Sequence, residues 1–139
     1  MFEGIIAMAK ENLKNGIPVG LGTDTACPYV TQYDMWRELC YYAKFCGVSN
    51  AFALYSATLL NAELAGIGGE TGSIERGKRA EMIVVRKNPL EDLRALRTPE
   101  MVIMGERLIR APRVKKSPRS KRNWINGCKK KKPPSGGFF

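Results

Sequence analysis

In the first half of the chain, apolar residues recur at helical spacing in three stretches, and a fourth stretch is a continuous apolar run. Residues 2–13, 35–45 and 51–64 carry apolar side chains at intervals of three and four, which predicts three helices. The third stretch is rich in alanine and leucine, so most of its surface is expected to be buried. Residues 17–23 form a short apolar run with small residues, which predicts a buried parallel strand that ends at Asp24.

The pattern changes from helical to extended near residue 71. Short strands are predicted at 72–74 and 82–85, separated by a turn at 75–78, and a helical turn is predicted at 91–96. Residues 101–104 and 107–109 flank Gly105-Glu106, which is typical of a two-residue hairpin loop. The chain therefore divides into an α/β part at 1–66, a segment of short strands at 67–112 and a tail at 113–139.

The charge of the chain is concentrated in the tail. Its 139 residues carry a net charge of +10, but residues 1–112 hold 13 Lys or Arg against 13 Asp or Glu, and residues 113–139 hold ten Lys or Arg and no acid. High like-charge density with Pro, Gly and Ser predicts a disordered tail. The tail could bind nucleic acid, but no pattern of aromatic residues accompanies the charges, so an unrelated extension is the favoured interpretation.

The residue types that are absent restrict the chemistry. The chain has no histidine, the usual metal ligand and general base, which excludes most self-sufficient hydrolytic sites. Cys27, Cys40, Cys46 and Cys128 lack the close pairs of a zinc site and are interpreted as reduced structural residues. No stretch has the length of a membrane span and no secretory leader is evident, so a cytoplasmic protein is expected.

Asp24 is the leading candidate for a functional residue. An acidic side chain at the C-terminal end of a parallel strand is a common site of catalysis, although the same residue could equally shape a turn. The tyrosines near it could line an aromatic pocket, but core packing is the favoured role for most of them. They are Tyr29, Tyr33, Tyr41 and Tyr42.

Three blocks of sequence carry a resemblance to a known family. They are Gly20-Leu21-Gly22-Thr23-Asp24, Ala57-Thr58-Leu59-Leu60-Asn61-Ala62 with Ala65-Gly66, and GSIERGKRAEMIVV at 72–85. In this order they resemble the C-terminal end of the amidohydrolase superfamily, especially its imidazolonepropionase-like and Xaa-Pro dipeptidase branch. The resemblance covers residues 1–112.

The resemblance implies a fold and a chemistry. Members are metal-dependent hydrolases of C–N bonds, with a (β/α)8 barrel beside a small β-sandwich. Residues 1–66 would be the terminal βα portion of the barrel, and residues 67–112 would belong to the sandwich. Asp24 would contact the metal, usually zinc, and carry a proton from the metal-bound water to the leaving nitrogen; it is the one candidate ligand in the chain.

This sequence also departs from the family, because the histidines that bind the metal are missing. We therefore expect a C-terminal fragment that binds no metal and is inactive by itself, with a missing N-terminal barrel segment or a second copy of the chain as partner. The alternatives are a catalytically inactive binding module and a nucleic-acid binder that uses its basic tail. The substrate, a small molecule, and the residues that bind it are not assigned. Exposed strand edges predict that residues 1–112 alone associate or aggregate.

Overall fold

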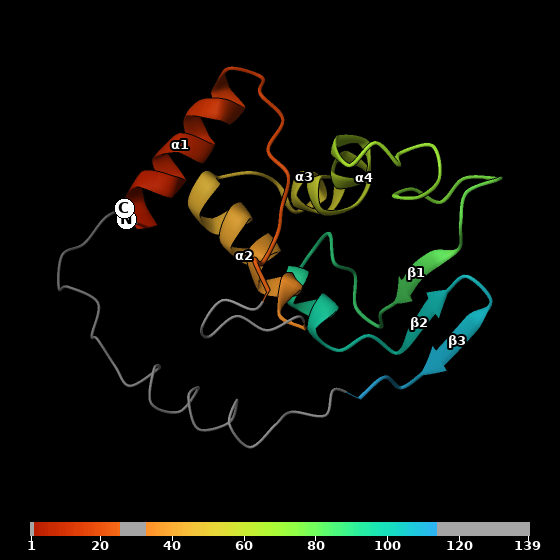
Figure 1. Cartoon of the computed structure of the whole chain (residues 1–139). Helices are drawn as coiled ribbons and strands as arrows, with labels where there is room; N and C mark the ends of the chain where they lie inside the picture. Colours follow the sequence, from red (N-terminus) through yellow and green to blue (C-terminus); the bar gives the residue numbers. More distant parts are fainter. Residues whose placement is uncertain (1, 26–32, 114–139) are drawn as a thin grey trace, which may run out of the picture.

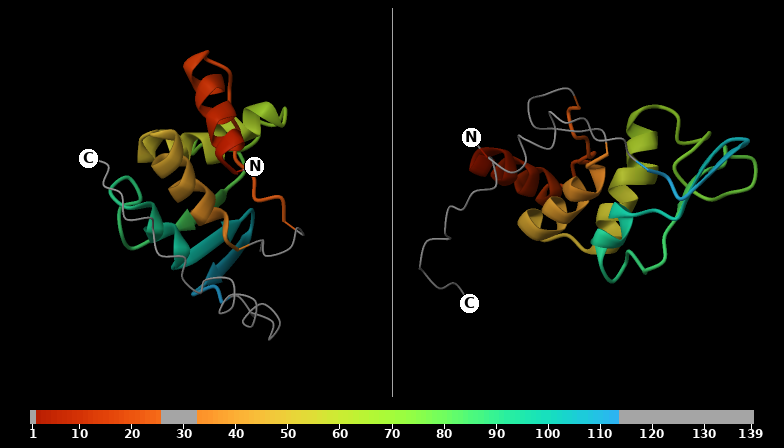
Figure 2. Two further views of the ribbon diagram at one scale, coloured as in Figure 1. Left: turned by 90° about the vertical axis from the view of Figure 1, so that its left-hand side faces the viewer. Right: turned by 90° about the horizontal axis from the view of Figure 1, so that it is seen from below.

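The computed structural model describes residues 2–25 and 33–113, which form a small α/β arrangement with the helices on one side and a sheet on the other (Figure 1). The helical elements are α1 (Phe2–Lys14), α2 (Met35–Cys46), α3 (Asn50–Tyr55), a π-helical turn (Ser56–Leu60), α4 (Asn61–Leu64) and a 3-10 helix (Leu93–Arg97). The strands are β1 (Glu81–Val84), β2 (Met101–Met104) and β3 (Arg107–Arg110). Figures 1 and 2 place α1 at the end of the molecule opposite the β2–β3 hairpin.

The three predicted helices are confirmed. α2 ends where Gly47 takes a left-handed conformation (φ 75°) and its N–H donates to the carbonyl of Ala43. Asp34 stands at the N-cap position of α2, but its side chain makes no capping hydrogen bond, and its Oδ1 lies 3.3 Å from Nε of Arg37. The stretch predicted as a helix at 51–64 is one helical segment that is interrupted by the π-helical turn.

The helical segment that begins at Asn50 has a side-chain cap. Oγ of Ser49 accepts a hydrogen bond from the backbone N–H of Phe52 at 3.1 Å. Asn50 is not the cap, because its Nδ2 donates to the carbonyl oxygens of Leu90 and Glu91 at 2.9 and 3.3 Å. This amide joins the start of α3 to the loop before the 3-10 helix.

Removing the cap should weaken the fold modestly. We expect Ser49→Ala to lower the free energy of unfolding by about 1 kcal/mol, because the N–H of Phe52 loses its acceptor. Urea unfolding followed by circular dichroism measures the change. Ser49→Asp retains an acceptor and should stay close to the parent protein; an equal loss in both variants would contradict a capping role.

The core lies where α2 meets α3 and the 3-10 helix. Leu39 and Tyr42 of α2, Ala53 of α3 and Leu93 of the 3-10 helix are buried and form one cluster. The partly buried residues packed against them include Leu13, Val19 and Leu21 from the N-terminal part of the chain. This packing brings α1 and the segment after it onto the same core.

The strand predicted at 17–23 is wrong as a paired strand. Residues 17–23 follow an extended path (Figure 1), but within the described part of the chain they join no strand ladder, and the sheet there contains only β1, β2 and β3. A strand requires a neighbouring backbone for its N–H and C=O groups, and the described residues place none beside this segment. A side chain replaces that backbone at Leu21, as described below.

Two further expectations need correction. Residues 72–74 are not a strand, since Gly72 (φ 94°) lies against the helical segment, where an added Cβ would be 2.7 Å from Cβ of Ala62. The helical segment over 51–64 is not mostly buried either. Phe52, Tyr55 and Leu64 keep 36 to 55% of their surface exposed, because the described neighbours cover one side only.

The predicted hairpin and its neighbouring strand are confirmed. The strand expected at 82–85 is β1, displaced by one residue, and the helical turn expected at 91–96 is the 3-10 helix. The strand order is β1-β2-β3, with all pairs antiparallel. Gly105 has φ 58° while Glu106 does not have a positive φ, which fits a type II′ turn.

Both faces of this sheet are apolar. The register aligns Met82, Ile103 and Leu108 on one face and Ile83, Val102 and Ile109 on the other. Ile83, Leu108 and Ile109 are between 43 and 49% exposed. The described residues therefore leave apolar surface uncovered on each side of the sheet.

The basic tail, the segment boundaries and the absence of a membrane span were also predicted from the sequence. The basic tail lies outside the described residues except for Arg113, and the boundaries at 66 and 112 stay predictions. Among the described residues, no helix has the length and apolar character to cross a membrane.

Candidate active site

Asp24 lies at the end of the extended segment that leads from α1 past the helical segment, drawn in orange in Figure 1. Its side chain is exposed and its backbone is left-handed (φ 49°). Few residues other than glycine adopt this conformation, although aspartate tolerates it better than most. Oγ1 of Thr23 and Oγ1 of Thr25 lie 2.7 Å apart, so the two neighbours of Asp24 are joined by a hydrogen bond. The segment thus presents Asp24 at a sharp change of backbone direction.

The position of this segment is set by Asn61, the first residue of α4. Nδ2 of Asn61 donates to the carbonyl of Leu21 at 2.7 Å, and Oδ1 accepts from the N–H of Leu21 at 2.9 Å. Asn61 belongs to one of the three blocks that carry the family resemblance, but the spacing of residues assigns it no role. The sequence does hold a signal for such a role, because Asn61 is the one amide side chain in the stretch rich in alanine and leucine at 51–64.

Gly20 allows the segment to approach α4 closely. A Cβ at this position would lie 2.6 Å from Oδ1 of Asn61 and 3.0 Å from Cδ1 of Leu64. The glycine at 22 differs, because an added Cβ there meets nothing within 4 Å. Of these two glycines, Gly20 is therefore the one whose small size is needed, because it allows the segment to contact the side-chain amide of Asn61.

The described residues do not fit the zinc site that the family resemblance implies. Within 2–25 and 33–113 there is no group of three His, Cys, Asp or Glu side chains that could hold a metal ion. Gln32 and Cys27, which follow Asp24 in the chain, lie outside the described residues. The role of Asp24 as ligand and catalyst stays a prediction.

The two described cysteines are free thiols in half-buried positions. Burial raises the pKa of both Cys40 and Cys46. A raised pKa keeps the thiol protonated near neutral pH, and only the thiolate binds metal or attacks carbonyl groups well. Their surroundings agree with the predicted structural role.

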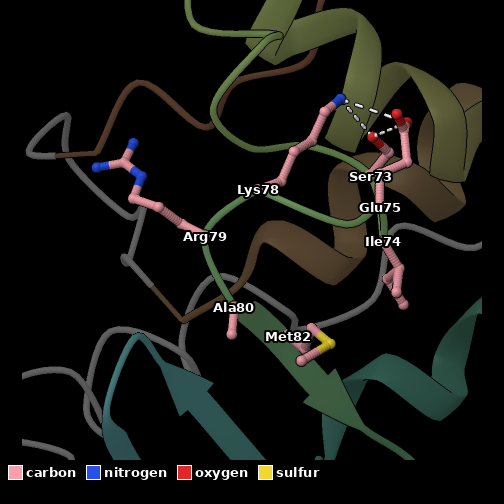
Figure 3. Close-up of a pocket in the computed structure, with 7 residues that line it drawn as sticks. All are labelled: Ser73, Ile74, Glu75, Lys78, Arg79, Ala80 and Met82. Atoms are coloured by element: carbon pink, nitrogen blue, oxygen red, sulfur yellow. Dashed lines mark hydrogen bonds and ion pairs between the residues drawn. The ribbon is translucent and has the colours of Figure 1, made fainter.

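Three side chains of types that often take part in catalysis line a small cavity of about 130 Å³ next to β1 (Figure 3). They are Ser73, Glu75 and Lys78. Nζ of Lys78 lies 2.6 Å from Oγ of Ser73 and 3.3 Å from Oε1 of Glu75, and Ser73 also bonds to Glu75. Hydrogen bonds from Ser73 and Lys78 lower the pKa of Glu75. Ser73, Glu75 and Lys78 thus contact one another within a stretch of six residues. This arrangement closes the turn at 75–78.

The aromatic residues after Asp24 do not form a common pocket in the described part of the chain. Tyr42 is in the core and packs near Phe52, whereas Tyr41 is 47% exposed and packs near Phe45. Tyr29 lies outside the described residues. Core packing, the favoured interpretation, is confirmed for Tyr42.

Comparison with known proteins gives consistent results. Residues 3–108 match the amidohydrolase family. Ochratoxinase from Aspergillus niger is 32% identical over 108 residues, which are 73% of this chain and 21% of that protein.

Solved structures agree with the sequence match. A candidate prolidase from Bifidobacterium longum is 38% identical with a TM-score of 0.79, over 87% of this chain and 30% of that one. A Xaa-Pro dipeptidase with bound methionine in its active site is 32% identical with a TM-score of 0.68, over 76% of this chain and 25% of that one. The chain thus spans between a fifth and a third of the length of these relatives. Its sequence and its fold show that the chain belongs to the amidohydrolase family.

Proposed function

We propose that this chain supplies the aspartate-bearing part of an amidohydrolase active site, in which Asp24 transfers protons during hydrolysis of a C–N bond. The observation that carries the proposal is the placement of Asp24. It is an exposed carboxylate on a left-handed residue, at the end of an extended segment that is fixed to α4 through Asn61. Sparsely populated backbone conformations of this kind cluster at functional sites.

The proposed chemistry needs a group that both accepts and donates a proton. The carboxylate of Asp24 takes a proton from the attacking water, while the oxygen of that water bonds to the carbonyl carbon. The C–N bond then breaks, and Asp24 delivers the proton to the departing nitrogen. The products are a carboxylic acid and an amine, and Asp24 returns to its ionised form.

The rest of the active site would come from additional polypeptide. We infer that residues 17–23 pair there with neighbouring strands of a (β/α)8 barrel, of which residues 1–66 form the terminal portion. Residues 67–112 would join a small β-sandwich. The exposed apolar side chains near the segment support this assignment, since Ile17, Tyr55 and Leu64 are 40 to 55% exposed. Zinc, if it is the metal of the completed enzyme, would be held by histidines of that polypeptide.

Reconstitution tests the proposal. The full chain is coexpressed with the Bifidobacterium longum candidate prolidase from which the matching 30% has been removed. We expect the two polypeptides to copurify in equal amounts and to hydrolyse Xaa-Pro dipeptides, the substrates after which one relative is named. Each polypeptide alone, purified in the same way with added zinc, is the control.

The outcomes separate the candidate functions. Hydrolysis by the mixture alone would support a divided active site. Copurification without hydrolysis would favour the alternative of an inactive binding module, and a failure to associate would contradict the proposed partner.

A further inference from the structure

We propose that Asn61 is a positioning residue, which holds the backbone at Leu21 and thereby fixes the carboxylate of Asp24. This inference rests on the proposed function of Asp24. Asn61 acts at a distance from the reacting groups, since its side-chain amide hydrogen-bonds to the N–H and the C=O of Leu21. Its effect on catalysis would pass through three residues of extended chain.

The amide of Asn61 performs the role of a neighbouring strand. An antiparallel partner exchanges two hydrogen bonds with one residue, by accepting from its N–H and donating to its C=O. Asn61 makes the same exchange with Leu21, at 2.9 and 2.7 Å, and both groups are partly buried. Only an amide side chain offers a donor and an acceptor side by side in this way. The extended segment is thus fixed at a point where the described residues provide no strand.

The π-helical turn explains why Asn61 faces the segment. Ser56–Leu60 contains wider turns than an α-helix, and Asn61 follows immediately. One extra residue in a turn rotates everything after it by about 100° relative to an uninterrupted α-helix. Ser56, the first residue of the turn, is fully buried, while Asn61 after the turn hydrogen-bonds to the extended segment. Such π-turns are frequent at functional sites.

The short distance along the chain makes the coupling strong. Three extended residues span at most about 10 Å, so an anchor at Leu21 restricts where Asp24 can lie. Misplacement of a catalytic group by about 1 Å can lower the rate about 100-fold. Loss of the anchor should therefore lower kcat while leaving KM nearly unchanged.

Two independent variants remove the anchor. Asn61→Ala deletes the amide, and Gly20→Ala adds a Cβ that would lie 2.6 Å from Oδ1 of Asn61, so the amide must move. Gly22→Ala is the matched control, because its Cβ meets nothing within 4 Å. Asn61→Asp keeps the acceptor for the N–H of Leu21 but loses the donor to its carbonyl, and should give an intermediate effect.

Two measurements test the variants. Hydrogen exchange of the full chain should show the amide of Leu21 exchanging about tenfold faster or more in Asn61→Ala and Gly20→Ala, with Leu39 in α2 unchanged. In the reconstituted enzyme, kcat should fall about 100-fold in both variants and KM should change little. Gly22→Ala should match the parent protein in the hydrogen exchange of the full chain, where its Cβ meets nothing within 4 Å.

The outcomes distinguish this inference from the proposed function. If Asp24→Asn inactivates the reconstituted enzyme while Asn61→Ala and Gly20→Ala keep the parent kcat, Asn61 is not a positioning residue. If Leu21 exchanges faster in both variants but kcat is insensitive to Asp24→Asn, the proposed function fails and the anchor is structural. An equal rise in exchange at Leu39 would show general destabilisation and would also overturn the inference.

Discussion

Asp24→Asn is expected to lower kcat of the reconstituted enzyme by about 10²- to 10⁴-fold, with little change in KM. Asparagine has nearly the shape of aspartate and tolerates the left-handed conformation at this position (φ 49°), so the segment should keep its path. The amide can neither take a proton from water nor deliver one to the departing nitrogen. The loss would therefore fall on the chemical step and not on substrate binding.

The control for Asp24→Asn is the same chemical change at a distant exposed carboxylate. Glu106 lies in the turn between β2 and β3 and is exposed. Steady-state kinetics of Glu106→Gln should match those of the parent enzyme. Activity that survives Asp24→Asn, or falls equally in both variants, would contradict the assigned role.

Leu39→Ala should have the largest effect on stability, lowering the free energy of unfolding by about 2 to 5 kcal/mol. Leu39 is 3% exposed and contacts the cluster of Tyr42, Ala53 and Leu93 that joins α2 to α3 and the 3-10 helix. Alanine would remove buried apolar area and leave a cavity where three elements meet. Since small domains are stable by only about 5 to 15 kcal/mol, the variant should be partly unfolded at moderate urea.

Urea unfolding at one fixed protein concentration measures this loss. Ile74→Ala is the matched control, because Ile74 is 86% exposed and its truncation should change stability by no more than about 0.5 kcal/mol. Similar losses in the two variants would show that the buried cluster is not the stabilising core.

The sequence predicted those elements whose signals are local. α2 is bounded by a left-handed glycine at its end, and the hairpin is specified by Gly105-Glu106 between two apolar runs. Such signals act within a few residues, so they can be recognised without knowledge of the rest of the fold. The same holds for the turn at 75–78, where Lys78 N–H donates to the carbonyl of Glu75.

The incorrect predictions all depended on distant partners. The apolar run at 17–23 has the composition of a strand, but a ladder needs a second backbone, and Leu21 instead bonds to a side chain 40 residues away. The alanine-rich stretch at 51–64 has the composition of a buried helix, yet Leu64 is 55% exposed. Both compositions suit surroundings that the described residues do not provide.

The candidate site was predictable in part. Asp24 was singled out because an acid ends an apolar run, and its catalytic role stays a prediction. The left-handed backbone of Asp24 and the anchor by Asn61 were not foreseen. Both depend on how the segment packs on α4, which one-dimensional spacing does not encode.

The three-stranded sheet has a consequence for the fate of the chain in a cell. With Met82, Ile103 and Leu108 on one face and Ile83, Val102 and Ile109 on the other, it has the composition of a middle layer and not of an outer wall. Surfaces of this kind attract chaperones and proteases, which recognise apolar segments that should be covered. The lifetime of the chain would then be set by how quickly other polypeptide covers the two faces, so its abundance would follow that of the partner proposed above.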